Sequence, residues 1–491
     1  MEFSAEFRYV LFQIEFTHKE KGTGMRLLAA LLTAILIGSP VLADDAGSVS
    51  PDLMKQFESR YNASGDHTAI RNAIANNKLS DLALNRDLIV KDNDYMDLKL
   101  KTAGITNQRS SGRCWLFAGL NVFAPDVMTK LNLSEFEFSQ TYLTFYDKIE
   151  KANLFLEQII AFRDLPIDDR KMQLVIESPF GDGGWWPYMI GLIQKYGVAP
   201  ASAMPETKQS ISTGTINDLA QRKLRADAAE LRQMSRDGKN VKQLRARKDE
   251  MLADIYKMMV LAYGQPPKEF DFRYESKDSA AVPVSKTYTP KSFYDEMLAP
   301  SMTDYVALMD NPNKPYDKPY KGEWSRNIYE NEDLTMLNVP ASKLKYYAKK
   351  LLLDSQVVWF ACDVGKEHCG DSALLQTDIY QYDKIFGTDI KLTKAQRLAF
   401  LDSGTNHAMA FAGIDTASDG SPVKWLVENS WGADRGDKGF WYMYDGWFDN
   451  YVYVVIVDKA HLDPDDLKNF EQKPEISPMW DPLMKSLKRL D

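Results

Sequence analysis

Residues 107–131 read NQRSSGRCWLFAGLNVFAPDVMTKL, a polar loop followed directly by a helical pattern, with Cys114 at the junction. The N-terminus of a helix has unpaired N–H groups and the positive end of the helix dipole, so a thiol there is favoured as a thiolate. Most free cysteines are simply small buried residues, so partner residues must decide whether this one is a nucleophile. The helix is predicted from the apolar positions Leu116, Leu120, Phe123, Val127 and Leu131.

Two later segments supply residues that can act with this cysteine. His407 opens a run of alternating small and apolar residues, which predicts a strand, and Asn429 ends a second short strand pattern. Alone, such a histidine is usually structural and such an asparagine usually belongs to a turn. Together, a cysteine and a histidine can form a thiolate–imidazolium pair with a thiol pKa of about 3–4, and an amide on the far ring nitrogen orients the imidazole. The order Cys114, His407, Asn429 therefore predicts catalysis by a thiol nucleophile.

These residues and their neighbours resemble the papain-like cysteine peptidases. The resemblance implies that Gln108, six residues before the cysteine, stabilises the oxyanion together with the cysteine N–H. It implies that Trp431 screens the His–Asn contact from water, and that Gly183 and Gly184 pair with the substrate backbone. It requires no metal and no other cofactor. The motifs that carry it are Gln108, Cys114-Trp, Asn-His407 and Asn429-Ser-Trp431-Gly.

Further motifs are similar to the bleomycin hydrolase and aminopeptidase C branch of that family, over about residues 80–482. Two features depart from the common papain pattern of Cys-Gly-[Ser/Ala]-Cys with a histidine about 130–150 residues downstream. The first of those cysteines is Ser111 here, and His407 follows Cys114 by 293 residues, which requires large insertions. The branch motifs are Ser-Ser-Gly-Arg-Cys114-Trp, Phe138-Ser-Gln-Thr-Tyr-Leu, Lys195-Tyr-Gly-Val, Met204-Pro-Glu-Thr, Val358-Trp-Phe-Ala-Cys-Asp-Val-Gly and Met479-Trp-Asp-Pro.

The composition is that of a globular enzyme rather than a disordered chain. The chain has 491 residues, of which 44% are hydrophobic and 26% charged, and its net charge is −9. An acidic balance gives no support to nucleic-acid binding, which needs a concentrated basic surface, so a nucleic-acid-associated protein is a weak alternative. A non-peptidase acyl transferase of the transglutaminase type is another alternative, although the third catalytic residue of such enzymes is usually Asp, where this chain has Asn429.

Residues 1–43 match a secretory signal peptide. Met25-Arg26 precedes eleven uncharged residues, 27–37, and Val41-Leu-Ala43 fits a cleavage site. We therefore expect translation to start at Met25 and the mature enzyme to be secreted or periplasmic; the alternative is an apolar N-terminal helix. The apolar run is too short to cross a bilayer, and no membrane span is expected in the mature chain.

The element pattern predicts an α+β protein with the papain-like two-lobe fold, a helical lobe and an antiparallel β-sheet lobe. Residues 44–95 are expected to form an N-terminal arm. The peptidase domain, 96–491, contains a helical insertion at about 209–264, which is rich in Ala, Leu and charged residues. A further helix is predicted over 133–155. Strands are predicted at 357–363, 407–413, 424–430, 439–444 and 451–458.

The three cysteines leave a pairing question open. As the nucleophile, Cys114 must stay unpaired, so Cys362 and Cys369 could form a disulfide in an exported protein. Two buried free thiols are equally compatible with the sequence. The adjacent pair His368-Cys369 is a weak metal signal because no second ligand pair accompanies it.

The C-terminal tail, 479–491, is where the chain departs from the branch it resembles. There the tail lies in the cleft and its terminal carboxylate, Asp491 here, holds the ammonium of the substrate, which makes the enzyme an aminopeptidase. Residues 483–491 lack the usual glycine and are about three residues too long, so we predict that the tail is trimmed by Cys114 or by a partner protease. If the tail is not a clamp, an endopeptidase is the alternative. The resemblance also implies a homohexamer with active sites facing a central cavity.

Overall fold

The computed structural model describes residues 47–277 and 284–486. The chain divides into two compact units, the first ending at Asn77 and the second beginning at Lys78. The described part of the first unit contains α2 (Pro51–Ala63) and α3 (Thr68–Asn76), within the predicted arm. The predicted signal peptide and the last five residues lie outside the described residues.

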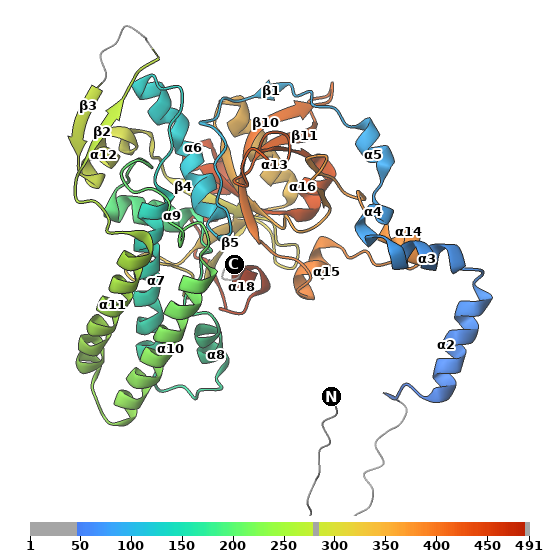
Figure 1. Cartoon of the computed structure of the whole chain (residues 1–491), viewed down its shortest axis with the longest axis horizontal. Coiled ribbons are helices and arrows are strands. Elements are labelled where there is room, and N and C mark those ends of the chain that lie inside the picture. The colour runs from blue at the N-terminus through green and yellow to red at the C-terminus, as the bar shows by residue number, and fades with distance from the viewer. Residues whose placement is uncertain (1–46, 278–283, 487–491) are drawn as a thin grey trace, which may run out of the picture. The chain divides into compact units, whose positions relative to one another are not determined.

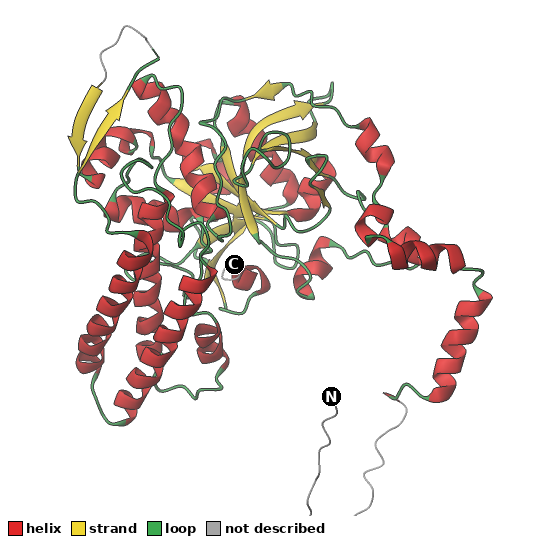
Figure 2. Ribbon diagram, in the orientation of Figure 1, coloured by secondary structure: helices red, strands yellow, loops and turns green. Residues whose placement is uncertain are grey.

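A twelve-stranded sheet forms the centre of the β lobe in the second unit (Figures 1 and 2). Its order is β14-β5-β6-β4-β13-β7-β10-β11-β12-β9-β8, and β1 (Leu98–Lys99) pairs with β10. The central strands are long runs of buried apolar residues, as expected for strands covered on both faces. They match the predicted ranges closely: β7 (Val358–Cys362), β10 (His407–Thr416), β11 (Pro422–Glu428), β12 (Phe440–Tyr444) and β13 (Val452–Asp458).

The sheet is mixed, whereas the sequence predicted an antiparallel one. Three pairs of strands run parallel, and a parallel pair requires a crossover that brings the chain back to the same end of the sheet. Except for β12, these strands lie in connecting segments where no particular strand was predicted, and each has only two to five residues. The parallel pairs are β4 (Tyr305–Met309) with β6 (Thr335–Asn338), β5 (Lys318–Gly322) with β14 (Glu475–Ser477), and β9 (Leu374–Leu375) with β12.

The helical lobe is built around α6 (Cys114–Leu131), which begins at the cysteine as predicted and packs against β10. α7 (Gln140–Ala161) begins seven residues later than predicted, because the Ser139 hydroxyl caps it by accepting the N–H of Tyr142. The insertion is a helical hairpin, α10 (Gly214–Arg236) and α11 (Val241–Tyr263), that packs along α7 (Figure 1).

A cluster of buried tryptophans joins the two lobes behind the N-terminus of α6. Trp359 on β7 donates its indole N–H to the carbonyl of Trp115 on α6 at 3.1 Å, which ties the helix to the sheet directly. Trp185 and Trp186 pack against Trp359 with ring centroids about 6 Å apart. Each fully buried side chain of this size contributes about 1.5–3 kcal/mol, so the position of α6 on the sheet is strongly determined.

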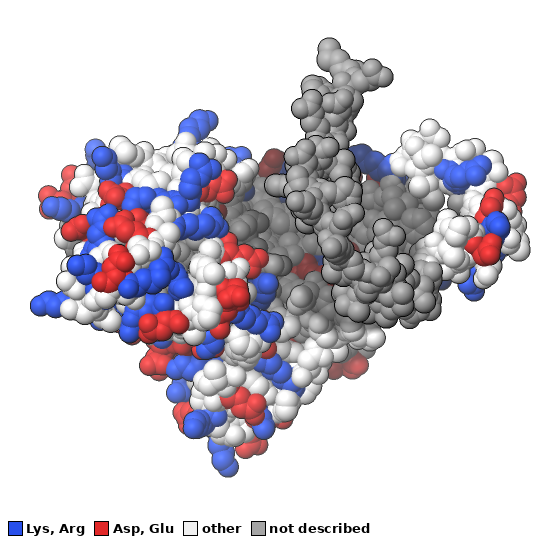
Figure 3. All heavy atoms as spheres, turned by 90° about the horizontal axis from the view of Figure 1, so that it is seen from below, with Lys and Arg blue, Asp and Glu red and all other residues white. Residues whose placement is uncertain are grey.

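The remaining elements include the edge strand β8 of the central sheet and a separate two-stranded sheet, β2-β3. On the face that Figure 3 shows, Lys and Arg side chains are interspersed with Asp and Glu. In the described part of the chain, no helix is both long and apolar enough to cross a membrane. All three cysteines are buried free thiols, so Cys362 and Cys369 are not bridged. The other elements are α4 (Leu79–Ala83), α5 (Arg86–Lys91), α8 (Arg170–Glu177), α9 (Trp186–Tyr196), β2 (Phe270–Tyr274), β3 (Val284–Tyr288), α12 (Pro290–Met297), α13 (Ala341–Leu353), β8 (His368–Cys369), α14 (Tyr382–Phe386), α15 (Lys394–Ala399), α16 (Asp445–Tyr451), α17 (Pro464–Phe470) and α18 (Pro482–Ser486), with short 3-10 turns at Ala299–Ser301 and Lys459–His461.

Candidate active site

Cys114 lies where the helical lobe meets the sheet. It is the first residue of α6 and is 2% exposed. Its sulfur faces the backbone N–H of Ala408, the residue after His407 on β10. Its own N–H has no hydrogen-bond partner among the described residues, as is normal for the first turn of a helix. The fold therefore brings the predicted nucleophile and the predicted histidine together, although 293 residues separate them.

His407 is held by the predicted asparagine and covered by the predicted tryptophan. Its Nε2 lies 2.8 Å from Oδ1 of Asn429, and the ring of Trp431 stacks beside it with centroids 4.8 Å apart. The same Oδ1 accepts the N–H of Ser430, so this atom is an acceptor and Nε2 must donate. In the neutral ring the other nitrogen, Nδ1, is then unprotonated and able to accept a proton.

Gln108 is fixed to the loop that carries the asparagine. Its N–H donates to the carbonyl of Ser430 at 2.8 Å, and its Oε1 accepts the hydroxyl of the same serine at 2.7 Å. One hydrogen of Nε2 goes to the carbonyl of Ser111 at 2.6 Å, and the other has no partner in the described part of the chain. The side chain is therefore oriented with one donor unused, close to the start of α6.

Burial sets the resting protonation of the cysteine and the histidine. It raises the pKa of Cys114 to about 11, against the backbone hydrogen bond from Ala408. It also lowers the pKa of His407 to about 4, against the hydrogen bond that its Nε2 donates to Asn429. The sequence pattern indicated a thiolate, whereas both shifts favour a neutral thiol beside a neutral imidazole at pH 7. Desolvation outweighs the helix dipole here, because each group would have to hold its charge in a buried site.

The turn from Gly181 to Gly184 presents one residue, Gly184, whose backbone N–H and C=O the described part of the chain does not use. The carbonyls of the first three residues each accept a hydrogen bond from a buried side chain. Gly184 has no partner for its N–H or its C=O among the described residues. A side chain there is excluded, since a Cβ atom would lie 2.5 Å from the indole of Trp115. The carbonyl of Gly183, predicted to bind substrate, is occupied by Lys151 at 2.5 Å.

The Peptidase C1-like family profile matches residues 48–484 of this sequence. The chain belongs to the peptidase C1-like family. This peptidase is 34% identical over 438 residues to Aminopeptidase C of Streptococcus thermophilus, covering 89% of this chain and 98% of the relative. It is 37% identical over 388 residues to Bleomycin hydrolase of Rattus norvegicus, covering 77% and 85% of the two chains.

The solved structure of PepW from Lactobacillus rhamnosis is similar to this peptidase over nearly its whole length. The two match with a TM-score of 0.85 at 35% identity, covering 89% of this chain and 99% of that one. The predicted resemblance to the bleomycin hydrolase and aminopeptidase C branch is therefore confirmed, as is the papain-like α+β fold. The protein is a cysteine peptidase.

Several charged residues that support the site of this peptidase were not identified from the sequence. Arg113, directly before the nucleophile, is buried and forms a two-fold ion pair with Glu206 at 3.0 and 2.9 Å. Lys151 donates to the carbonyl of Gly183 in the glycine turn, and the carboxylate of Asp182 in that turn accepts the N–H of Gly112. The only signal for the arginine was its place in the Ser-Gly-Arg-Cys motif, because charged residues in loops and on helices usually face solvent.

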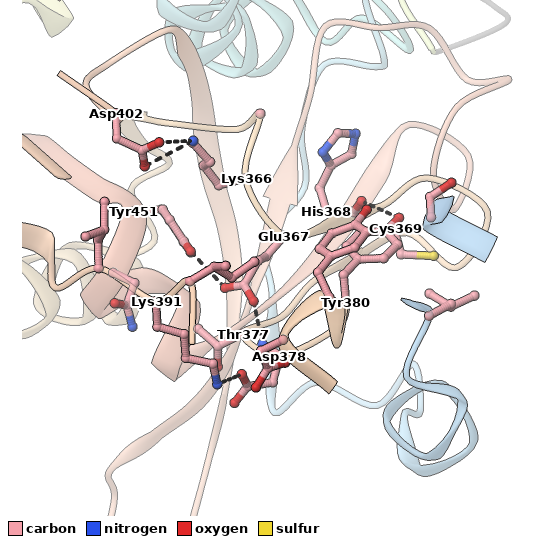
Figure 4. A pocket seen from close by; sticks show the side chains of 18 of the residues that line it. Lys366, Glu367, His368, Cys369, Thr377, Asp378, Tyr380, Lys391, Asp402 and Tyr451 are labelled. Carbon is pink, nitrogen blue, oxygen red and sulfur yellow. Dashed lines mark hydrogen bonds and ion pairs between the residues drawn. The ribbon is translucent and has the colours of Figure 1, made fainter. Parts of the chain in front are cut away.

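A large polar cavity adjoins the Trp431 side of the peptidase site (Figure 4). The ring of His368 lies 6.3 Å from that of Trp431 and lines the cavity, which measures about 890 Å³. In the wall of the cavity, the carboxylate of Glu367 accepts the hydroxyl of Tyr451 at 2.8 Å and the N–H of Asp378 at 2.7 Å. Among the described residues no group of three or more His, Cys, Asp and Glu side chains that could hold a metal ion is found.

The C-terminal helix α18 of the peptidase ends beside the strand that carries the histidine. The hydroxyl of Ser486, the last described residue, accepts the N–H of Thr405 at 3.2 Å and lies 2.9 Å from its hydroxyl. Thr405 is two residues before His407. Asp491, the predicted ammonium clamp, lies outside the described residues.

Proposed function

We propose that this cysteine peptidase is an exported aminopeptidase whose nucleophile is Cys114. The observation that supports it best is the hydrogen-bonded chain from Gln108 through Ser430 and Asn429 to His407, on the strand beside the thiol. This arrangement brings together the unused donor of Gln108, the oriented base His407 and the thiol of Cys114. Aminopeptidase C, to which the chain is similar over most of its length, carries the activity in its name.

The reaction begins with transfer of the thiol proton to Nδ1 of His407. The thiolate and the imidazolium attract each other, and this attraction offsets the cost of desolvating each charge, so the transfer can occur although each group alone resists charge. The sulfur then attacks the peptide carbonyl, and the oxyanion accepts hydrogen bonds from the N–H of Cys114 and the unused hydrogen on Nε2 of Gln108. The imidazolium gives its proton to the leaving amine, and a thioester remains.

Hydrolysis of the thioester returns the enzyme to its starting state. His407, again neutral, takes a proton from water, and the resulting hydroxide attacks the thioester carbonyl. The C–S bond breaks, the acid product leaves, and the sulfur recovers its proton from the imidazolium. Asn429 holds the ring in one orientation through both stages. Gly184 pairs with the substrate backbone through its N–H and C=O.

Removal of single N-terminal residues requires a group that recognises the free ammonium. After Ser486 the full tail has five residues, enough to extend about 17 Å, whereas a tail that ends at Leu487 places its carboxylate only one residue, about 3.6 Å, beyond Ser486. A tail that starts beside Thr405 can therefore bring a carboxylate close to the nucleophile, where it would pair with the substrate ammonium. We propose that the tail is trimmed and that the new terminal carboxylate is the clamp, because the full tail would overrun the cleft.

A comparison of free and N-acetylated peptides tests this assignment. Wild type and a chain that ends at Leu487 are assayed on both, with Cys114→Ala as the inactive control, and the C-terminal mass of each is recorded. We expect the shorter chain to cleave free peptides one residue at a time and to spare acetylated ones. Equal cleavage of both peptides by both forms, with no trimming, would show an endopeptidase.

Export and assembly are tested separately. The mass of protein recovered from the secreted or periplasmic fraction should match a chain beginning at Asp44; full-length chain retained in the cytosol contradicts export. Light scattering of the mature protein should give the mass of a hexamer, and a stable monomer contradicts that assembly.

A further inference from the structure

Four charged residues are buried beneath the Gly183–Gly184 turn. Asp147 and Lys148 of α7 and Asp182 of the turn are at most 4% exposed, and the side chain of Lys151 is 10% exposed. We call these four residues the platform. Even when buried charges are paired and hydrogen-bonded, they often stabilise a protein no more than hydrophobic residues of similar volume would, so stability alone does not explain this arrangement.

Asp182 joins three separate segments through its carboxylate. Oδ2 accepts the backbone N–H of Gly112 at 2.9 Å, in the loop that leads to Cys114, and also the hydroxyl of Thr213. Oδ1 accepts Nζ of Lys148 at 2.6 Å and Nδ2 of Asn217 at 2.8 Å. All four acceptor positions of the carboxylate are used, so it can move only if several partners move with it.

The two lysines of the platform hold the backbone of the turn. Lys148 donates to the carbonyl of Gly181 at 2.9 Å, and Lys151 donates to that of Gly183 at 2.5 Å. Lys151 is itself paired with Asp147 at 2.6 Å. Because these carbonyls point inward to the cations, the N–H and C=O of Gly184 are the backbone groups left to meet the substrate.

We infer that the platform is a positioning device, which fixes the substrate-pairing turn and the loop before Cys114 relative to each other through one shared carboxylate. This inference rests on the proposed role of Cys114 as the nucleophile. It assigns to Asp182 and Lys151 an effect on catalysis without contact to the reacting atoms.

The charges of the platform also affect the pKa of Cys114. Two cations and two anions sum to zero, and the negative charge of Asp182 acts to raise the pKa of Cys114. Although burial opposes it, the ion pair with Lys148 holds the pKa of Asp182 well below its usual range, so it stays ionised. Burial lowers the pKa of Lys151, and Asp147 opposes that shift. Two tyrosines also interact with the platform: Tyr188 with Asp147, and Tyr263 with Asp147 and Asp182. Tyr263 interacts in turn with Arg113 and Glu206.

Two variants with opposite charge changes test the inference. Asp182→Asn gives the platform a net positive charge, and Lys151→Met gives it a net negative one. The pH dependence of Cys114 alkylation by iodoacetamide is measured for each, with kcat and KM on a fluorogenic aminoacyl amide and the unfolding temperature. The matched control is Lys248→Met, because the side chain of Lys248 is as buried as that of Lys151. Lys248 is paired at 2.8 Å with Glu157, which lies on α7 about two turns beyond Lys151.

We expect the alkylation midpoint to fall by roughly 0.5–1 pH unit in Asp182→Asn and to rise by a similar amount in Lys151→Met. In Lys151→Met the released turn should also raise KM roughly tenfold. Lys248→Met should lose stability without moving the midpoint. Shifts of the same sign in both platform variants, or lost stability with no shift, would overturn the inference. Alkylation is read against Cys114→Ala as background, and activity in that variant would refute the proposed nucleophile instead.

Discussion

Replacing Glu428 by glutamine is expected to stabilise the peptidase, by an amount that grows as the pH rises from 5 to 8. The side chain is 3% exposed at the end of β11, next to Asn429, and its Oε1 accepts Nδ2 of Asn121 at 2.6 Å. Burial raises the pKa of Glu428 to about 7 from an ordinary value of 4.5, against hydrogen bonds from Thr102 and Asn121. The carboxyl is therefore protonated in the folded chain at pH values where it is ionised in the unfolded chain.

The sign and the size of the effect follow from proton linkage. Between pH 4.5 and 7 the folded state binds more protons at Glu428 than the unfolded state does, so the stability of the wild type falls as the pH rises through this window. A shift of one pKa unit is worth about 1.4 kcal/mol. Relative to low pH, the free energy of unfolding of the wild type is therefore lower by about 1 kcal/mol at pH 5 and by about 3 kcal/mol at pH 8. Glutamine resembles the protonated acid, keeps an acceptor for Asn121, and does not titrate.

The assay is guanidinium unfolding of wild type and Glu428→Gln at pH 5 and pH 8. The variant should gain about 2 kcal/mol more at pH 8 than at pH 5. Glu157→Gln is the control of opposite sign, because Arg245 and Lys248 lower the pKa of Glu157 although burial opposes them. That variant should lose stability at pH 8. An equal effect of Glu428→Gln at both pH values would refute the reasoning, since it would mean that the carboxyl titrates alike in both states.

Two further substitutions test the geometry of the site. Gly184→Ala should lower kcat/KM at least tenfold and cost about 1–3 kcal/mol of stability, because the added Cβ would lie 2.5 Å from the indole of Trp115. Gly214→Ala, whose Cβ would meet nothing within 4 Å, is its control in thermal unfolding and kinetics; equal behaviour of the two contradicts the packing argument. Gln108→Ala should lower kcat about 10²–10³-fold with an unchanged fold, as measured with a fluorogenic aminoacyl amide. Full turnover in that variant would remove Gln108 from the oxyanion site.

The sequence alone determined the elements that depend on neighbouring residues. The helix that begins at Cys114 and the strand that begins at His407 follow from apolar periodicity, which reflects one buried face or a fully buried strand. The motifs around Gln108 and Asn429 were recognisable because each is contiguous. The start of α7 was misjudged because apolar residues before its Ser139 cap pack in a loop, and periodicity does not distinguish a buried loop from a first helical turn.

Only the tertiary structure decided which distant residues share a buried space. Asp182 receives donors from residues 112, 148, 213 and 217, and no sequence spacing indicates that these segments meet. The parallel strand pairs likewise depend on crossovers between segments far apart in the chain. The raised pKa of Cys114 belongs to the same class, since a helix N-terminus can be read from sequence but desolvation cannot. Burial is a property of everything packed around a group, and so it is absent from any local pattern.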